Sequence, residues 1–429
     1  MIRYIGFEGL VKRLYKSMKR IFLLMLFLAL PGCARIDDGR TKITYQTMET
    51  LPEQRKALAQ MVKEFEEQYP HIRVEVFTST TSFQKLLIQI AAGNAPDVFY
   101  YVTDRLPGLV KGGVVADLTA RMKEVELDEY FREIVDSCAI DGKYYLFPFH
   151  YSTDVLFYNK DLFDKMGVGY PDENWRWDDF LNAAVKLTVK KNGRTVQYGT
   201  LQPRPLLMIK SFGGRCFNDS LTKCMLNSPE TKKALQYIID LDQRYGVAPL
   251  EAVINDMERM DGVDMFSAGK VAMLLGRTFM LAEFRKLKYF DWDIAPIPVG
   301  KIPYSRLAVG GNCISAESKH PEEAWQFAEF YSGRKGSEIC GTSGNCVPAL
   351  KKVAYSEDFL AAPPQNAILF VDSIQYARTD NPGLVCWEEF YQRVVQENAD
   401  KIICGNISMD EGLREMEREG NKLLRNCGR

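Results

Sequence analysis

Histidine is rare in this sequence, and so are the motifs on which enzymatic chemistry depends. Only three histidines occur in 429 residues, and His71, His150 and His320 stand in unrelated surroundings. There is no Cys-x-x-Cys, no His-Glu-x-x-His, no Gly-x-Ser-x-Gly, and no Gly-x-Gly-x-x-Gly after an apolar strand. Those patterns mark zinc sites, hydrolases and dinucleotide-binding folds. The sequence therefore predicts a protein that is not an enzyme, with no catalytic residues, no metal site and no cofactor.

Most of the chain also lacks a cluster of positive charge. Lys and Arg number 55 against 56 Asp and Glu, which gives a formal net charge of −1. Residues 1–32 hold six of these basic residues and one acid, so the rest of the chain is mildly acidic. Proteins that bind nucleic acid concentrate basic residues on one face. We therefore expect no nucleic-acid partner.

The apolar run near the start of the chain is too short to cross a membrane. It extends over ten residues, from Ile21 to Leu30, whereas a membrane-spanning helix needs about 20. Basic residues precede it, which is typical of a secretory signal peptide. The following Leu30-Pro31-Gly32-Cys33 resembles the bacterial lipobox, which implies cleavage before Cys33 and a lipid anchor on its sulfur. An ordinary signal peptide with an incidental cysteine is the alternative, and the translation start is open between Met1 and Met18.

Ten cysteines are many for an exported protein. With Cys33 lipidated, an odd number remains, so at least one thiol stays unpaired within the chain. The pairs Cys216/Cys224 and Cys340/Cys346 each bracket a short loop and could close small disulfides. Free buried thiols are an equally good interpretation of most of these cysteines.

The residues after a short polar tether alternate between strand and helix patterns. Residues 34–41 are polar, and they precede the first strand pattern. The alternation of strands and helices is typical of an α/β sheet, whose ligands bind beyond the carboxyl ends of its strands. We therefore expect the mouth of a site at Thr47–Leu51 and Tyr100–Arg105. We expect the strands and helices at Lys42–Gln46, Gln54–Tyr69, Ile72–Phe77, Ser82–Ala92 and Asp97–Val102.

The segment DGKYYLFPFHYSTDVLFYNKDLF, residues 141–163, organises the rest of the chain. A turn at Asp141-Gly142 leads into the aromatic run Lys143–Phe149, and a second β-rich run follows at Val155–Tyr158. No tight hairpin turn joins the two runs. This pattern indicates a chain that leaves one sheet and enters another.

Several segments resemble a known family in their order and spacing. They are VKEFEEQYPHIRVEV, AAGNAPDVFYYVTDR, LVKGGVVADLT, GKYY with Pro148 and LFYNKDLF, and FSAGKVAMLLG. Together they are similar to the extracellular solute-binding proteins of ABC transporters, family 1, the maltose-binding-protein type. The resemblance implies an α/β, two-lobed periplasmic-binding-protein-like fold of type II. Each lobe would be a mainly parallel sheet flanked by helices, with hinge crossovers between the lobes.

The resemblance also implies the limits of the domains. The hinge crossovers would lie near residues 148–151, 295–298 and 332–345. The expected parts are a signal peptide with lipobox at 1–33, a tether at 34–41, lobe 1 at 42–148 and 297–332, and lobe 2 at 149–296 and 333–429.

The family places an aromatic residue and an Asp-Arg pair against the sugar. The matching positions here are Tyr101, Asp104 and Arg105, and Trp387 matches a stacking Trp of the second lobe. A Gly-x-Trp pattern of the family is absent, because Arg277 follows Gly276. The ligand-binding residues expected on this basis are Thr47, Tyr101, Asp104, Arg105, Thr153, Asp154, Gln202, Arg204, Arg277, Gly310, Gly311 and Trp387.

Each of these assignments has a structural alternative. The Asp104-Arg105 pair could cap a turn, and Arg277 could begin a solvated helix. The family's Gly-Gly loop, matched by Gly310-Gly311, could serve only a tight turn. Trp387 could be a core residue.

The function implied is that of an extracytoplasmic, lipid-anchored substrate-binding subunit of an ABC importer. It would capture a carbohydrate between two lobes by hinge closure and deliver it to the permease subunits. We expect a monomer. Arg105, Arg204 and Arg277 together suggest an acidic sugar as one possibility. The alternatives are a secreted glycan-active enzyme and a binder of a non-sugar solute, such as a polyamine, with the same fold.

Overall fold

The computed structural model describes residues 38–49, 52–79, 81–249, 262–343 and 346–427. Its contacts divide the chain into a unit of residues 1–40 and a unit of residues 41–429. The expected signal peptide and Cys33 lie outside the described residues, and so does most of the expected tether. Everything below concerns residues 41–429.

The first sheet has six strands, in the order β14-β6-β13-β3-β1-β2. β1 runs parallel to both β2 and β3, while β13 is antiparallel to β3 and β6. β14 closes one edge by pairing antiparallel with β6. The strands are β1 (Thr41–Thr47), β2 (Ile72–Thr78), β3 (Val98–Val102), β6 (Phe147–Ser152), β13 (Ala308–Ile314) and β14 (Val347–Pro348).

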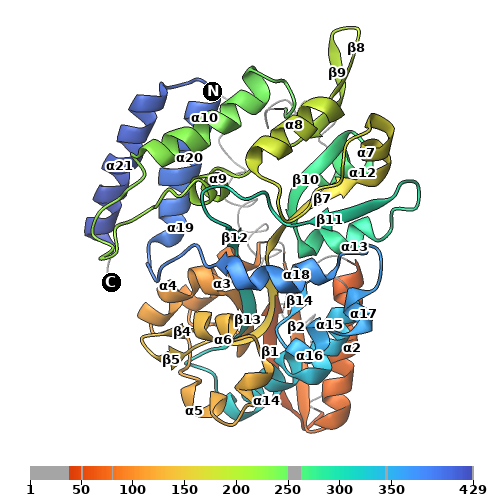
Figure 1. Ribbon diagram of the computed structural model, residues 1–429. Coiled ribbons are helices and arrows are strands. Elements are labelled where there is room, and N and C mark those ends of the chain that lie inside the picture. The colour runs from red at the N-terminus through yellow and green to blue at the C-terminus, as the bar shows by residue number, and fades with distance from the viewer. Residues whose placement is uncertain (1–37, 50–51, 80, 250–261, 344–345, 428–429) are drawn as a thin grey trace, which may run out of the picture. The chain divides into compact units, whose positions relative to one another are not determined.

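Amphipathic helices cover this sheet. In α2 (Pro52–Gln68), Leu58, Met61 and Phe65 recur at helical spacing and are buried. Phe65 packs edge-on against Phe327 of a second covering helix, with ring centroids 5.1 Å apart. The other helices of this region are α3 (Ser82–Ala91), α4 (Leu106–Lys111), α5 (Thr119–Met122), α6 (Arg132–Ser137), α14 (Pro321–Ser332), α15 (Arg334–Ser343), α16 (Lys351–Ala354) and α17 (Glu357–Leu360). Figure 1 shows this sheet and its helices in the lower half of the view.

The second sheet has five strands, in the order β11-β7-β10-β9-β8. β7 is the most deeply enclosed of them, because all six of its residues are buried. The strands are β7 (Asp154–Asn159), β8 (Val189–Lys191), β9 (Arg194–Thr200), β10 (Val271–Arg277) and β11 (Trp292–Ala295).

Helices from two distant parts of the sequence surround the second sheet. Asn159 ends β7 and caps α7, since its side chain accepts a hydrogen bond from the Leu162 N–H at 3.0 Å. The chain's last helices pack beside α10 in the same half of the view (Figure 1). The helices here are α7 (Lys160–Met166), α8 (Trp177–Leu187), α9 (Pro205–Ser211), α10 (Pro229–Gln243), α12 (Gly262–Ser267), α13 (Leu281–Phe284), α18 (Ile368–Asp372), α19 (Trp387–Glu389), α20 (Glu397–Ile403) and α21 (Met409–Asn426).

Short elements complete the described chain. They include a π-helical stretch between α19 and α20, which is labelled η5. The set is β4 (Ala139–Ile140), β5 (Lys143–Tyr144), β12 (Ser305–Arg306), β15 (Ala377–Arg378), η1 (Thr103–Arg105), η2 (Leu127–Glu129), η3 (Thr278–Met280), η4 (Ser373–Tyr376) and η5 (Phe390–Gln396).

The crossover expected in residues 141–163 is confirmed. β6 belongs to the six-stranded sheet and β7 to the five-stranded sheet, and Thr153 alone separates them. The turn at Asp141-Gly142 is also present, with φ of 50° and 76°. Successive strands therefore enter different sheets, as the missing hairpin turn indicated.

The expectation of mainly parallel sheets is wrong. Parallel pairing joins β1 to β2, β1 to β3 and β10 to β9, whereas the other neighbours in both sheets are antiparallel. The reason is that β7 and β13 each arrive from the other sheet and not through a strand–helix–strand unit within their own sheet. Only the latter connection returns the chain in the same direction.

Cys216 and Cys224 do not form the disulfide that their spacing allowed; both thiols are free and buried, which was the alternative interpretation. Phe217 faces Cys224 in an antiparallel bridge, and the Met225 N–H binds the Cys216 carbonyl, so the two cysteines are adjacent and do not face each other. The side chain of Cys340 lies outside what is described, so its pairing with Cys346 stays a prediction. A disulfide that the sequence did not indicate joins Cys386 to Cys427, with Cα atoms 5.5 Å apart.

Within the described residues, no helix is both long enough and apolar enough to span a membrane.

Candidate functional site

A cavity of about 470 Å³ opens where strands of the six-stranded sheet end. Thr47 to Glu49 follow β1, and Tyr100 to Asp104 follow from β3, so the carboxyl ends of two parallel strands meet at its wall. The first turns of α2 and residues of β6 and β13 complete that side. Arg277 and Phe279 reach it from the end of β10 in the other sheet. The cavity is thus lined from both sheets.

Aromatic side chains form much of the wall. The rings of Tyr100 and His150 are stacked, with centroids 5.6 Å apart and planes 8° apart. Phe83 of α3 and Phe149 of β6 also line the cavity. Phe279 is half exposed there, at 50% of its free surface. Flat apolar faces of this kind suit the C–H faces of a sugar ring.

Gly310 is required by the close approach of Tyr100 and His150. A Cβ atom at Gly310 would lie 2.3 Å from the Tyr100 hydroxyl oxygen and 2.8 Å from His150 Nε2. A Cβ at Gly311 would lie 2.1 Å from the carbonyl oxygen of Phe147. The expectation of a Gly-Gly loop is wrong, since both glycines are inside β13. The absence of side chains lets neighbouring strands and rings pack against this one.

His150 is neutral at physiological pH. Burial lowers its pKa to about 4, because the charged imidazolium is disfavoured away from water. Its Nδ1 is buried and has no hydrogen-bond partner among the described residues. The imidazole therefore offers a ring face and unused hydrogen-bonding capacity to whatever enters the cavity.

Asp154 holds two arginines at the start of β7. Arg277 Nε lies 3.1 Å from Asp154 Oδ1, and Arg204 donates to the same oxygen. Burial alone would raise the pKa of Asp154, but the two guanidinium groups outweigh it and keep that pKa below its usual value. Asp154 is 2% exposed. It is therefore a buried carboxylate that neutralises and orients two cations.

A second arginine cluster lies at Arg306. Its guanidinium donates to Asp104 of η1, and its Nε is 3.0 Å from Asp380 Oδ2. Burial would lower the pKa of Arg306, yet the two carboxylates outweigh it and raise that pKa. Tyr304 donates a further hydrogen bond to Asp380. Arg306 thus connects the end of β3 to the segment that follows β15.

Arg105 forms a third contact between distant segments. Arg105 Nη2 lies 2.6 Å from Glu388 Oε1 of α19, and its guanidinium stands 4.4 Å from the centre of the Phe83 ring. The pair is partly exposed, so it contributes little to the free energy of unfolding by itself.

Four of the expected ligand-binding residues line the cavity, among the described residues: Thr47, Asp104, Arg277 and Gly310. Two more, Asp154 and Arg204, contact Arg277 directly or through the shared carboxylate. Gln202 does not line the cavity. Its side-chain Nε2 is buried and has no hydrogen-bond partner among the described residues. The ligand roles of all twelve residues stay predictions.

The remaining expected residues are held by the protein itself. Tyr101 is buried, 4% exposed, and its ring packs against Phe83 and Phe99. The Thr153 hydroxyl donates to the Phe370 carbonyl at 3.2 Å. Trp387 is 3% exposed and is stacked on Phe390.

Sequence reasoning missed several lining residues. Tyr100 was passed over because the family alignment selected its neighbour Tyr101, and successive residues of a strand point to opposite faces. Glu49 lies in the segment expected at the mouth, but no motif distinguished it. Phe83, Phe279 and Arg306 come from a helix, a short turn and a two-residue strand, and nothing in their local sequence marks them.

Metal binding finds no support in the described residues, where His, Cys, Asp and Glu do not gather in groups of three or more that could hold an ion.

The family follows from comparison with known proteins. Residues 49–338 match the model of the bacterial extracellular solute-binding protein family. This chain belongs to that family. Its members bind solutes and are not catalysts, which confirms the prediction of a non-enzyme.

Curated relatives of this solute-binding protein cover most of its length. An arabinooligosaccharide-binding protein of Bacillus subtilis is 29% identical over 338 residues, which is 74% of this chain and 75% of the relative. A melibiose/raffinose/stachyose-binding protein of the same species is 24% identical over 262 residues, 59% of this chain and 58% of the relative.

Solved structures confirm the α/β periplasmic-binding-protein fold. An ABC substrate-binding protein of Listeria monocytogenes, in complex with cycloalternan, superimposes with a TM-score of 0.82 and 31% identity. The superposition covers 90% of this chain and 99% of that protein. A maltose-bound protein of T. maritima superimposes with a TM-score of 0.77 at 22% identity, covering 89% and 100%.

Proposed function

We propose that this solute-binding protein is the extracytoplasmic substrate-binding subunit of an ABC importer and that its solute is an oligosaccharide. The protein binds the sugar in the cavity at Tyr100, His150 and Phe279 and does not alter it. The permease subunits then receive the sugar. This proposal names a class of solute, not an individual sugar.

One observation carries the proposal most directly. The cavity combines five aromatic or imidazole rings with a few polar groups held in fixed positions, and it is lined from both sheets. Sugar sites are built in this way, because rings contact the C–H faces while fixed donors and acceptors read the hydroxyl groups. Likeness to a cycloalternan-binding protein and to arabinooligosaccharide-binding and mannobiose-binding proteins supports the same class of ligand.

Closure of two lobes would trap the sugar. We propose that lobe 1 comprises residues 42–148 and 297–332 together with β6 and β14, which belong to the six-stranded sheet, and that lobe 2 is the rest of 149–296 and 333–429. Arg277 and Phe279 line the cavity from the end of β10 in the five-stranded sheet. A ligand favours the closed form only through contacts that exist when both lobes engage it. We therefore assign to these two residues the part of the binding energy that drives closure.

Attachment to the cell membrane would come from Cys33. The lipobox-like Leu30–Cys33 implies a thioether-linked lipid after cleavage, and a relative from Streptomyces antibioticus is described as a lipoprotein. Two acyl chains are sufficient for stable anchoring. We propose that the protein acts there as a monomer beside its permease.

Binding is tested by thermal shift and calorimetry on the purified protein. The sugars offered are cycloalternan, arabinotriose, mannobiose, maltose and raffinose, with spermidine and galacturonate as the non-sugar and acidic comparisons. A true ligand raises the melting temperature, since saturation at a hundred times Kd stabilises by about 2.7 kcal/mol. No shift with any sugar and a shift with spermidine would overturn the proposal.

A pair of variants locates the binding in this cavity. Phe279→Ala removes a half-exposed ring from the cavity wall, so it should raise the Kd for the sugar at least about tenfold. Tyr289→Ala removes a ring that is 67% exposed and does not line the cavity, so it should leave Kd unchanged. Equal effects of the two variants would place the sugar elsewhere.

A further inference from the structure

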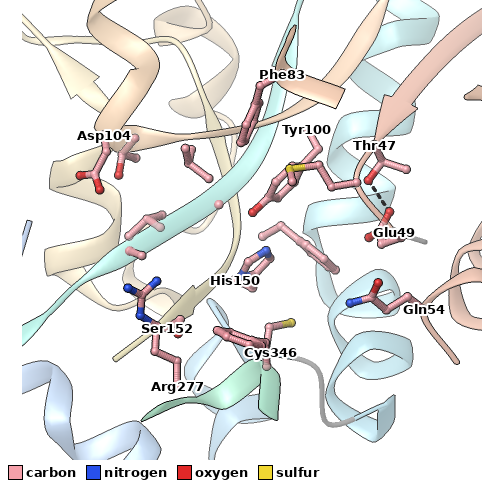
Figure 2. A pocket seen from close by; sticks show the side chains of 18 of the residues that line it. Thr47, Glu49, Gln54, Phe83, Tyr100, Asp104, His150, Ser152, Arg277 and Cys346 are labelled. Carbon is pink, nitrogen blue, oxygen red and sulfur yellow. Dashed lines mark hydrogen bonds between the residues drawn. The ribbon is translucent and has the colours of Figure 1, made fainter. Parts of the chain in front are cut away.

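A carboxyl group without a cationic partner stands on the cavity wall. Glu49, just beyond β1, accepts hydrogen bonds from the Thr47 hydroxyl on one oxygen and from the Tyr331 hydroxyl on the other. Figure 2 shows the Thr47 bond and places Glu49 beside Gln54 of α2. Within the described chain, no Lys, Arg or His forms an ion pair with it. Both of its partners are neutral hydroxyl groups.

The other formal charges of the wall are matched. Arg306 is paired with Asp104 and Asp380, and Arg277 is paired with Asp154. The Arg–Asp contacts are buried or half-buried, so their charges cancel at short range. The three arginines Arg204, Arg277 and Arg306 are thus balanced in total by the three carboxylates Asp104, Asp154 and Asp380. Glu49 is the lining group that adds uncompensated negative charge.

This arrangement removes the basis for an acidic solute. The acidic-sugar hypothesis rested on Arg105, Arg204 and Arg277. The first of these contacts Glu388, and the other two share Asp154. An anionic sugar that engaged one of these arginines would compete with the carboxylate that already holds it.

We propose that Glu49 is a specificity-determining residue of the cavity: its carboxylate accepts hydrogen bonds from hydroxyl groups of a neutral sugar and rejects sugars that carry an acidic group. This inference rests on the proposed function and narrows it. A carboxylate offers about four lone-pair sites, and the two protein hydroxyls occupy only two of them. The remaining sites can accept only from a donor, which the hydroxyl groups of a sugar supply and an ionised carboxylate group does not.

The surroundings of Glu49 make its charge sensitive to pH. Burial raises its pKa above the ordinary value, while the hydrogen bonds from Thr47 and Tyr331 oppose that shift. The titratable groups facing it are Tyr331 of α14, Tyr45 of β1 and, across the cavity, Tyr100 and His150. Burial raises the pKa values of Tyr45 and Tyr331 well above the usual range, so both stay neutral. With the pKa of His150 lowered to about 4, its ring is neutral as well.

Discrimination against acids should therefore follow the protonation of Glu49. Above its pKa the carboxylate repels an anionic group. As the pH falls through that pKa, Glu49 becomes a neutral acid that can also donate, and the repulsion disappears. The ratio of the two dissociation constants, acidic over neutral, should decline as the pH is lowered through the raised pKa of Glu49.

The experiment compares each neutral sugar with its own aldonic acid. The probes are maltose and maltobionate, mannobiose and mannobionate, and arabinotriose and its aldonate, measured by calorimetry at pH 8 and pH 5. Oxidation of a sugar to its aldonic acid also opens one ring and so changes its shape. The informative quantity is therefore the difference in the acid-to-neutral ratio of Kd values between the wild type and each variant. In the wild type we expect the acid to bind at least about a hundredfold more weakly at pH 8. Glu49→Gln should reduce that ratio at least about tenfold and abolish its pH dependence.

Two further variants keep the test decisive. Tyr331→Phe retains the carboxylate but removes one donor to it, which raises the pKa of Glu49, so the ratio should decline at a higher pH than in the wild type. Glu357→Gln removes an exposed carboxylate at the start of α17, outside the cavity wall, and should leave the ratio unchanged.

The outcomes separate this inference from the proposed function. If neutral sugars bind and the acid-to-neutral ratio is the same in the wild type, Glu49→Gln and Tyr331→Phe, Glu49 has no selective role and the inference is wrong. If no sugar binds the wild type at all, both the proposed function and this inference are wrong. Tighter binding of an aldonate than of its parent sugar would also overturn the inference, while leaving sugar binding intact.

Discussion

Arg277 Nε lies 3.1 Å from Asp154 Oδ1, and the two residues face each other across the antiparallel pairing of β10 and β7. The carboxylate is buried, whereas the guanidinium reaches the cavity wall. A residue that lines the site is therefore positioned by one that belongs to the sheet beneath it.

Replacement of Asp154 by Ala should be strongly destabilising. It leaves Arg277 and Arg204 without their shared acceptor, and breaking a buried ion pair costs about 3–5 kcal/mol. Because both arginines are partly exposed, we expect a loss near the lower end, about 3 kcal/mol in the free energy of unfolding. Urea denaturation measures it. Glu338→Ala, which breaks the exposed Arg334–Glu338 pair on α15, should cost less than about 1 kcal/mol.

Gly310→Ala should weaken sugar binding more than it weakens the fold. The new methyl group would meet the Tyr100 hydroxyl and His150 Nε2, so the stacked pair must move away from β13. We expect an increase in Kd of at least about tenfold, by calorimetry, because misplaced lining groups lose their contacts with the ligand. Gly169→Ala, where a Cβ meets nothing within 4 Å, is the matched control and should leave Kd unchanged. Equal Kd values for the two variants would contradict the role of Gly310.

His150 should make the fold less stable in acid. Its pKa is about 4 in the folded state, against about 6.5 in an unfolded chain, so the unfolded state binds more protons between those values. The stabilising contribution is complete above pH 6.5 and is lost as the pH falls from 6.5 toward 4. After allowing for partial exposure of the ring to the cavity, we expect about 2 kcal/mol.

The variant His150→Gln isolates this effect. The free energy of unfolding of the wild type, minus that of the variant, should decrease as the pH is lowered from 7 to 4. His71→Gln, which removes an exposed imidazole just before β2, is the matched control for the substitution itself. A flat difference for His150→Gln over the same range would show that the imidazole titrates as it does in water.

Trp387→Ala tests whether this tryptophan is a core residue. Its ring is stacked on Phe390 and lies near Phe217 and Tyr391, all within one hydrophobic cluster. Truncation of such a side chain costs about 3–5 kcal/mol. We expect the melting temperature to fall clearly, while Trp387→Phe should retain most of the stability. Unchanged stability together with a lost affinity for sugar would instead favour the stacking role.

The fold was largely predictable because its elements carry strong local patterns. The helix at α2 repeats apolar residues at helical spacing and stops before Pro70. The strand at β1 alternates polar and apolar residues, and the strand at β3 is a short apolar run. The crossover at Thr153 was readable because two strand patterns met without turn residues. The direction in which the strands pair could not be predicted. It depends on the sheet to which the chain returns, and the local sequence carries no information about that sheet.

The site was less predictable for two reasons. Neighbouring residues of a strand point to opposite faces, and some residues are positioned by partners far away in the sequence. A shift of one residue in β3 exchanges Tyr100 for Tyr101 and so exchanges the cavity for the core. Arg306 acquires its position from Asp104 and Asp380, which are far away in the sequence. The disulfide between Cys386 and Cys427 spans 41 positions, and only the folded chain brings these two cysteines together.

That disulfide bears on how the protein should be made. It fastens the end of α21 to the residue immediately before Trp387 and Glu388, and Glu388 contacts Arg105. Material produced in a reducing cytosol would carry two thiols in place of this link, with its last helix held only by packing and by polar contacts such as Lys232–Asp410 and Asn227–Glu417. Preparations recovered from an oxidising compartment are therefore the appropriate ones for affinity measurements, and reductant should be left out of the buffer.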